Sequence, residues 1–141
     1  MTSMDELVRT LHEGGFTLVM ANGDDVRTFR RRGVADLVGL LDDDPAFLRG
    51  ALAADKVVGK GAAALMAKGG IRALHTDVLS RPALELLRSE GISAECDRLV
   101  PHIVNRAGTG WCPVERLCHG LTSVDEMVAA IRVFVNDMKQ Q

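Results

Sequence analysis

The sequence predicts an α/β fold, in which helices cover a mixed β-sheet, and three patterns support this prediction. Residues 16–30 hold a short apolar run and a returning segment joined by turn-forming residues, which is typical of a β-hairpin. Residues 71–100 alternate strand, helix and strand patterns, which favours parallel pairing. Residues 124–138 place apolar side chains three and four apart, as an amphipathic helix does. A length of 141 residues suits one domain, and we expect a single domain over 1–141.

Local signals predict the first helix and the hairpin. Ser3 begins an S-x-x-E capping box, and the glycine pair at 14–15 ends the helix that follows it. An apolar run over 16–21 then predicts a strand. The Asn-Gly-Asp-Asp sequence at 22–25 supplies a turn, and the chain is expected to return as a second strand over 26–30.

The next segment is predicted to be helical. A short helix is expected around 37–41, where apolar residues cluster after Gly33, and the acidic residues before Pro45 end it. Residues 46–68 are then expected to be mostly helical, because this stretch contains a run of alanines, the best helix former. A second glycine pair, at 69–70, closes it.

The second half is predicted to alternate. Strands are expected over 71–78 and 92–100, with a helix over 82–90 between them that has proline near its first turn. A glycine-bearing loop then leads to a short helical turn over 113–118. Ser123 begins a second capping box, which starts the final helix.

Composition excludes several classes of protein. The net charge is −2, which argues against binding nucleic acid through phosphate neutralisation, and the short run Arg30-Arg31-Arg32 is interpreted as a solvated strand end. No apolar stretch is long enough to cross a membrane, and the polar, acidic residues 1–6 do not resemble a signal peptide. Three cysteines do not form a disulfide framework, so we expect a cytoplasmic protein.

The first candidate site is the segment 54–61. On a helix, Lys56 and Lys60 would share a face, and Asp55 could cap that helix or accept a hydrogen bond from a ligand. Gly59 and Gly61 would allow a close approach. The alternative is an exposed helix face with a cap and two packing glycines, and composition alone favours this plainer interpretation.

The second candidate site is the loop 105–115, which contains Asn105 and Arg106. Cys112 precedes a proline at a predicted helix start, where unpaired N–H groups and a nearby cation lower the pKa of a thiol. Burial against Trp111 would oppose this effect. Glu115 could serve as an acid or a base. The alternative is that Cys112 is a buried small apolar residue, as many free cysteines are.

No metal or cofactor site is predicted. Cys112, Cys118 and His119 lie close in sequence, but the two cysteines are six residues apart and no C-x-x-C motif occurs, whereas structural zinc sites use closer pairs. Cys96, His75 and His102 lie elsewhere. We therefore expect the protein to hold no stoichiometric zinc.

The segments ADKVVGKGAAAL (residues 54–65) and NRAGTGWCPVE (residues 105–115) together resemble a bacterial and archaeal family of unknown function, which is grouped with the cytidine-deaminase-like fold. The resemblance runs from about residue 6 to about residue 134. It implies a three-layer α/β/α domain with a mixed sheet, which agrees with the order of elements above.

The resemblance implies a fold and not a deaminase activity. A zinc deaminase carries His-x-Glu or Cys-x-Glu on one helix and Pro-Cys-x-x-Cys on the next. No histidine or cysteine of this chain has a glutamate two residues later. The helix expected in the first position would carry Asp55, Lys56 and Lys60, and the next begins near Pro82 without a cysteine.

These observations lead us to expect a metal-free domain that binds a small molecule, nucleotide-like or phosphorylated, with enzymatic activity left open. The residues expected in one pocket are, for ligand binding, Asp55, Lys56, Lys60, Asn105 and Arg106 and, for any chemistry, Cys112 and Glu115. One alternative is a non-catalytic homo-oligomeric or partner-binding module, in which the same residues pin the loop to the helix. Another is a thiol-redox protein that uses Cys112 and Cys118.

Overall fold

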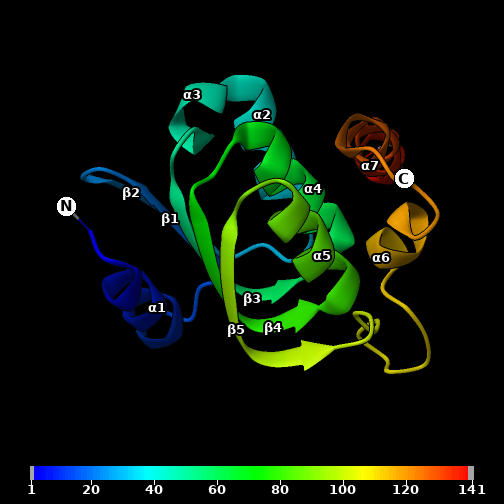
Figure 1. The fold of residues 1–141 in the computed structure, drawn as a ribbon, viewed down its shortest axis with the longest axis horizontal. Helices are drawn as coiled ribbons and strands as arrows, with labels where there is room; N and C mark the ends of the chain where they lie inside the picture. Colours follow the sequence, from blue (N-terminus) through cyan, green and yellow to red (C-terminus); the bar gives the residue numbers. More distant parts are fainter. Residues whose placement is uncertain (1, 140–141) are drawn as a thin grey trace.

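The protein contains a mixed five-stranded sheet with helices on both faces, as the sequence predicts (Figure 1). The computed structural model describes residues 2–139. The strands lie in the order β2-β1-β3-β4-β5, and their bounds are β1 Leu18–Asn22, β2 Asp25–Phe29, β3 Leu52–Val58, β4 Ala73–Ser80 and β5 Ser93–Val100. The helices are α1 Met4–Glu13, α2 Ala35–Asp43, α3 Pro45–Leu48, α4 Lys60–Gly69, α5 Arg81–Ser89, α6 Pro113–Cys118 and α7 Val124–Lys139.

The sheet joins an antiparallel half to a parallel half at β3. β1 pairs antiparallel with both β2 and β3, so the expected hairpin is present and lies at one edge of the sheet. β3, β4 and β5 are parallel, and α4 and α5 connect them. Because the three parallel strands point the same way, the helices that follow β3 and β4 begin at the same edge of the sheet.

Helices bury the two faces of the sheet unequally. α1 covers one face with Leu7 and Leu11, which pack against Val19 and Ala54. The other face carries the larger core, formed by α2, α4 and α5 on the sheet. α6 and α7 then pack on the outer side of α4, so α1 and α7 lie on opposite sides of the molecule in Figure 1.

The prediction of a mostly helical segment over 46–68 is wrong. This segment forms the short helix α3, the strand β3 and the helix α4. β3 is the central strand, and Ala53 and Ala54 are both fully buried on its opposite faces. A strand that is covered on both sides has a continuous apolar sequence without alternation. Small, helix-forming alanines in such a run imitate a helix.

This correction moves two candidate residues. Asp55 and Lys56 lie on β3 and not on a helix, so Lys56 and Lys60 do not share a helix face and Asp55 does not cap α4. The N-cap of α4 is Gly59, which has no side chain with which to cap. The group that accepts a hydrogen bond from the first N–H of α4 therefore comes from elsewhere in the chain.

Other helix starts follow the sequence signals. The hydroxyl oxygens of Ser3 and Ser123 accept hydrogen bonds from the backbone N–H groups three residues later, as a capping box requires. Ser80 does the same for α5. None of the helices in the described part of the chain combines the length and the apolar character that crossing a bilayer demands.

Candidate functional site

A large cleft opens beside the carboxyl-terminal half of β3 and the start of α4. Its volume is about 1100 Å³, on the scale of clefts that hold small-molecule ligands. Its walls come from the segment before and at the start of α2, from β3 and α4, from the loop before α6, from the first turn of α6 and from the end of α7. In an open α/β sheet, ligands bind outside the carboxyl ends of the strands, which is where this cleft lies.

The cleft brings together most of the residues that the sequence singles out. Its lining includes Asp55, Lys56, Asn105, Arg106, Cys112 and Glu115. The two candidate segments, some fifty residues apart in sequence, therefore line the same cleft. Their role in binding a ligand stays a prediction.

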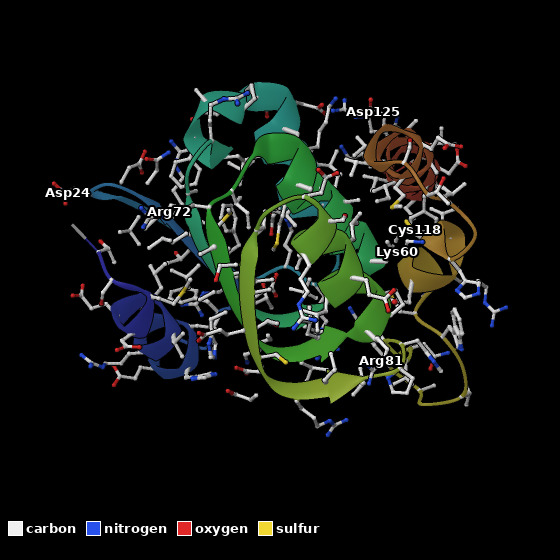
Figure 2. All side chains as sticks on the ribbon, in the orientation of Figure 1. Asp24, Lys60, Arg72, Arg81, Cys118 and Asp125 are labelled. Atoms are coloured by element: carbon white, nitrogen blue, oxygen red, sulfur yellow. The ribbon has the colours of Figure 1, made fainter. Side chains whose placement is uncertain are left out.

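Lys60 has a structural contact in place of the predicted ligand contact. Its Nζ donates to the backbone carbonyl of Leu121 at 2.7 Å and to that of His119 at 3.3 Å. Both carbonyls lie just after α6, and Figure 2 shows Lys60 beside Cys118 where α4 faces α6. The Lys60 ammonium thus interacts favourably with the partial negative charge at the end of a helix. Lys60 does not belong to the cleft lining.

Glu115 supplies the missing cap of α4. Its Oε2 accepts a hydrogen bond from the backbone N–H of Lys60 at 3.1 Å, and the residue is only 3% exposed. A carboxylate at a helix N-terminus satisfies one of the unpaired N–H groups and interacts favourably with the helix dipole. Lys60, the first residue of α4, is therefore joined to α6 twice: to Glu115 in the first turn of α6 and to the carbonyls just after its end.

Two glycines let α6 approach α4 closely. A Cβ at Gly59 would lie 2.0 Å from Oε2 of Glu115, and a Cβ at Gly61 would lie 2.2 Å from Cγ1 of Val114. No side chain fits at either position without displacing its neighbour. The sequence suggested a close approach at these glycines, and the structure shows that the approaching group is a carboxylate-bearing helix of the same chain.

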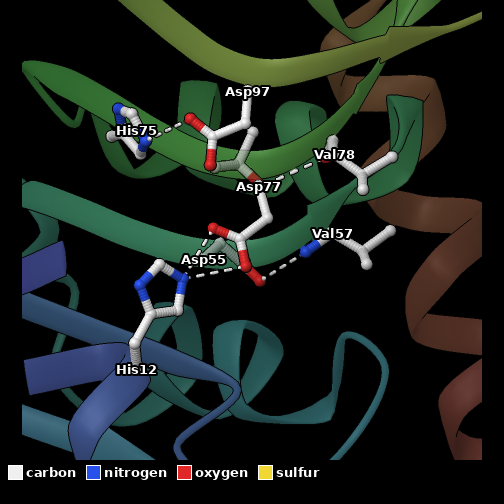
Figure 3. A network of polar contacts seen from close by, with 8 residues as sticks. His12, Asp55, Val57, His75, Asp77, Val78 and Asp97 are labelled. Carbon is white, nitrogen blue, oxygen red and sulfur yellow. Dashed lines mark hydrogen bonds and ion pairs between the residues drawn. The ribbon is translucent and has the colours of Figure 1, made fainter. Parts of the chain in front are cut away.

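Asp55 is a cleft carboxyl group whose pKa is raised toward neutrality. Burial raises the pKa of Asp55 from 3.8 to about 7; hydrogen bonds from the backbone N–H groups of Val57 and Lys56 oppose this effect, and the charge of Asp77 adds to it. The bond from Val57 to Oδ1 is 3.3 Å long (Figure 3). At neutral pH, Asp55 is therefore divided between its two protonation states and can donate or accept a proton.

A second polar cluster lies near Asp55, on the strands beside α1. Nε2 of His12 contacts both carboxylate oxygens of Asp77 at 2.9 Å, and Nε2 of His75 lies 3.4 Å from Asp97 (Figure 3). Within residues 2–139, no group of three His, Cys, Asp or Glu side chains is arranged to hold a metal ion. These exposed or half-buried polar contacts join α1 and β5 to β4.

Basic side chains outnumber acidic ones on the cleft wall. The basic residues are Arg31, Arg32, Lys56, Arg106 and Lys139, and the acidic ones are Asp36, Asp55 and Glu115. Arg31 is neutralised by Asp36, at 2.9 and 2.5 Å. Among the described residues, the other four basic side chains have no ion-pair partner, so the wall carries excess positive charge. The interpretation of Arg30-Arg31-Arg32 as a plain strand end missed this, although such a run just before a helix start was a usable signal.

The loop before α6 is ordered by its own polar groups. Oδ1 of Asn105 accepts from the backbone N–H of Thr109 at 3.0 Å, and its Nδ2 donates to the hydroxyl of the same residue at 3.1 Å. A bridge between Val104 and Trp111 closes the loop. Asn105 therefore shapes the loop, whereas the exposed Arg106 points no polar group at another described residue.

The two cysteines of the redox alternative lie in different environments. Cys112 is half-buried at the N-cap of α6 and lines the cleft. Cys118 is fully buried at the other end of this six-residue helix. Burial raises the pKa of the Cys118 thiol to about 11, and such a thiol is a poor nucleophile at neutral pH. This contrast weighs against a working Cys112–Cys118 thiol pair.

Alkylation rates should separate these cysteines. In single-cysteine variants, we expect iodoacetamide at pH 8 to label Cys118 far more slowly than Cys112, because burial raises the pKa of the Cys118 thiol to about 11 and shields it from the reagent. As a control, the alkylation rates of the two cysteines should become equal in denaturant, where neither thiol is buried. Equal rates in the native protein would contradict the environments described above.

Comparisons with known proteins place the chain beside proteins without an assigned activity. A family model described as a domain of unknown function (DUF1893) matches residues 6–135. A crystal structure of a DUF1893 family protein, TM1506 from Thermotoga maritima, has a TM-score of 0.80 and 25% sequence identity, and the match covers 97% of this chain and 92% of that one. No curated protein matches this chain significantly.

Proposed function

This chain belongs to the DUF1893 family, a family of unknown function, and we propose that it binds an anionic small molecule in the cleft beside α4. The observation that carries the proposal is the excess of unpaired basic side chains on the cleft wall, namely Arg32, Lys56, Arg106 and Lys139. A concave wall lined by one sign of charge attracts ligands of the opposite sign. A phosphorylated or nucleotide-like molecule has the charge and the size for such a cleft.

The start of α4 is not the place for the anionic group. The carboxylate of Glu115 already lies there and accepts the N–H of Lys60. A second negative group beside it would be repelled. We therefore assign the anionic group of the ligand to the exposed basic side chains of the cleft wall.

We place this function on a cytidine-deaminase-like scaffold. The support is that α4 and α5 each begin directly after a parallel strand, at one edge of the sheet. Zinc deaminases place their metal-binding motifs on two successive helices. Here α4 begins with Lys60, whose side chain bonds the carbonyls after α6, and α5 begins with Arg81.

Thermal shift measurements test the proposal. We expect AMP to raise the melting temperature of the wild-type protein by several degrees and adenosine to have little effect, because a ligand at about a hundred times its Kd stabilises the native state by about 2.7 kcal/mol. The double variant Lys56→Ala/Arg106→Ala should lose most of the AMP effect. Both side chains are exposed and unpaired among the described residues, so the fold should tolerate their loss.

The matched control removes two basic residues away from the cleft. Arg9→Ala/Arg88→Ala takes the same charge from exposed positions on α1 and α5, and it should retain the AMP effect. The proposal fails if AMP does not stabilise the wild type, or if the two double variants respond alike.

A second candidate function is a non-catalytic interaction module. The Lys60 ammonium bonds carbonyls after α6, and the Asn105 amide bonds Thr109 within its own loop, so both polar groups are used within this chain's fold. Under this candidate, AMP would have no effect, and sedimentation of the purified protein would show a stable oligomer.

A further inference from the structure

One oxygen of Glu115 has no partner. Oε2 accepts the backbone N–H of Lys60, but Oε1 is buried and accepts no hydrogen bond from any described residue. The residue is 3% exposed, and it belongs to the cleft wall. Buried carboxylate oxygens are normally satisfied, because leaving one without a donor is costly. This oxygen is the only buried side-chain N or O atom without a partner in residues 2–139.

The Glu115 carboxylate is held in place. The backbone of Gly59 lies so close that an added Cβ would come within 2.0 Å of Oε2. One oxygen is thus engaged by the helix start and packed against Gly59. Oε1 is left as an unsatisfied acceptor on a residue that lines the cleft.

The cleft has two chemically different parts. Arg32, Lys56 and Arg106 are exposed, whereas Glu115 is buried. An anionic group suits the exposed basic side chains, and a hydrogen-bond donor suits the buried acceptor. A ligand that satisfies both parts needs opposite functions at its two ends.

Resting on the proposed function, we propose that the ligand carries an amino group that donates a hydrogen bond to Oε1 of Glu115, at the end opposite its anionic group. The ligand class is thus a phosphorylated or similarly anionic metabolite with a free amino group. A donor that meets a buried carboxylate forms a charge-assisted hydrogen bond, which is stronger than one between neutral groups. A ligand with a carbonyl at the same place would set two acceptors against each other and bind poorly.

Two pairs of nucleotides test this inference. In each pair one member has an amino group on the ring, and the other has a carbonyl at the same position. Titration calorimetry with CMP and UMP, and with AMP and IMP, gives the ratio of the Kd values in each pair. We expect the amino member to bind the wild type at least tenfold more tightly than the carbonyl member. The difference should appear in every pair whose ring places this substituent at Oε1, which is one pair or both.

The variant Glu115→Gln sharpens the test. The glutamine carbonyl must accept the N–H of Lys60, so its NH₂ group takes the position of Oε1 and becomes a donor. The preference for the amino member should disappear or reverse in favour of the carbonyl member. A merely structural role of Glu115 would weaken both members equally and leave the ratio unchanged. Glu126→Gln, at an exposed position on α7, is the matched control and should keep the wild-type ratio.

The outcomes distinguish the two proposals. Nucleotide binding that depends on Lys56 and Arg106 but shows the same Kd for both members of each pair would overturn the amino-group inference and leave the anionic cleft intact. An unchanged ratio in Glu115→Gln would also overturn it. No binding of any of the four nucleotides would overturn both proposals. Should Glu115→Gln fail to fold, the wild-type ratios in the two pairs decide the matter.

Discussion

Replacing Gly59 with alanine should lower the free energy of unfolding by about 3 kcal/mol, measured by urea denaturation. The added Cβ would lie 2.0 Å from Oε2 of Glu115 and 3.1 Å from Cγ1 of Ile103. The carboxylate must then leave the start of α4, which removes a helix cap worth about 0.5–2 kcal/mol and leaves a buried charged group without its donor at a further cost of about 1–3 kcal/mol.

Backbone conformation does not contribute to this effect. The φ of Gly59 is −100°, in the extended region that any residue adopts. The matched control is Gly39→Ala in α2, where nothing lies within 4 Å of the added Cβ. Alanine in a helix is preferred over glycine by about 0.5–1 kcal/mol, so this variant should be slightly stabilised.

A double-mutant cycle identifies the cause. In Glu115→Ala the carboxylate is gone, so adding Gly59→Ala should cost far less than it does in the wild type. The interpretation fails if the two single effects add, or if Gly59→Ala changes the unfolding free energy by less than about 0.5 kcal/mol, within the range of ordinary surface substitutions.

Asp55→Asn should stabilise the protein at pH 8 and leave its stability at pH 4 nearly unchanged. Because the pKa of Asp55 is raised from 3.8 to about 7 in the folded protein, the folded state binds more protons than the unfolded state between these two values. Stability contributed by this group is therefore present at low pH and is lost as the pH rises from about 4 to about 7.

The size of the effect follows from linkage. A difference of one pH unit between folded and unfolded pKa values corresponds to about 1.4 kcal/mol, which gives an upper limit of about 4 kcal/mol here. Solvent reaches the half-buried side chain, so we expect about 2 kcal/mol. Asparagine has a similar shape and no charge, so it avoids this cost.

Urea denaturation at pH 4, 6 and 8 provides the measurement. The difference in stability between Asp55→Asn and the wild type should grow with pH, whereas the difference for Asp137→Asn, an exposed position on α7, should stay small. A difference for Asp55→Asn that is constant across this range would show that Asp55 has an ordinary pKa.

Several parts of the fold were predictable because short-range signals determine them. The caps at Ser3 and Ser123 depend on a hydroxyl that bonds a backbone N–H three residues away, so the sequence alone locates them. The hairpin follows from its turn residues and the amphipathic final helix from its spacing. The short helix over 113–118 is also confirmed, with proline at its start.

β3 could not be located from local patterns. Its alanines favour a helix when considered alone, and only the coverage of both faces of the sheet makes a strand of them. Burial of a whole segment is a property of its neighbours in space, and tertiary contacts override a propensity worth less than about 1 kcal/mol per residue. For this reason Asp55 and Lys56 were predicted on a helix, whereas they lie on β3. Both residues nevertheless line the cleft.

The sequence by itself determined the α/β class, most of the element order and the two segments, 54–65 and 105–115, that meet at the cleft. The tertiary structure decided what each side chain does there. Lys60 bonds the carbonyls after α6, Glu115 caps α4, and Arg32 joins the basic wall. These roles depend on contacts between residues about fifty positions apart, and the free energy of such contacts depends on burial and distance, which no local pattern records.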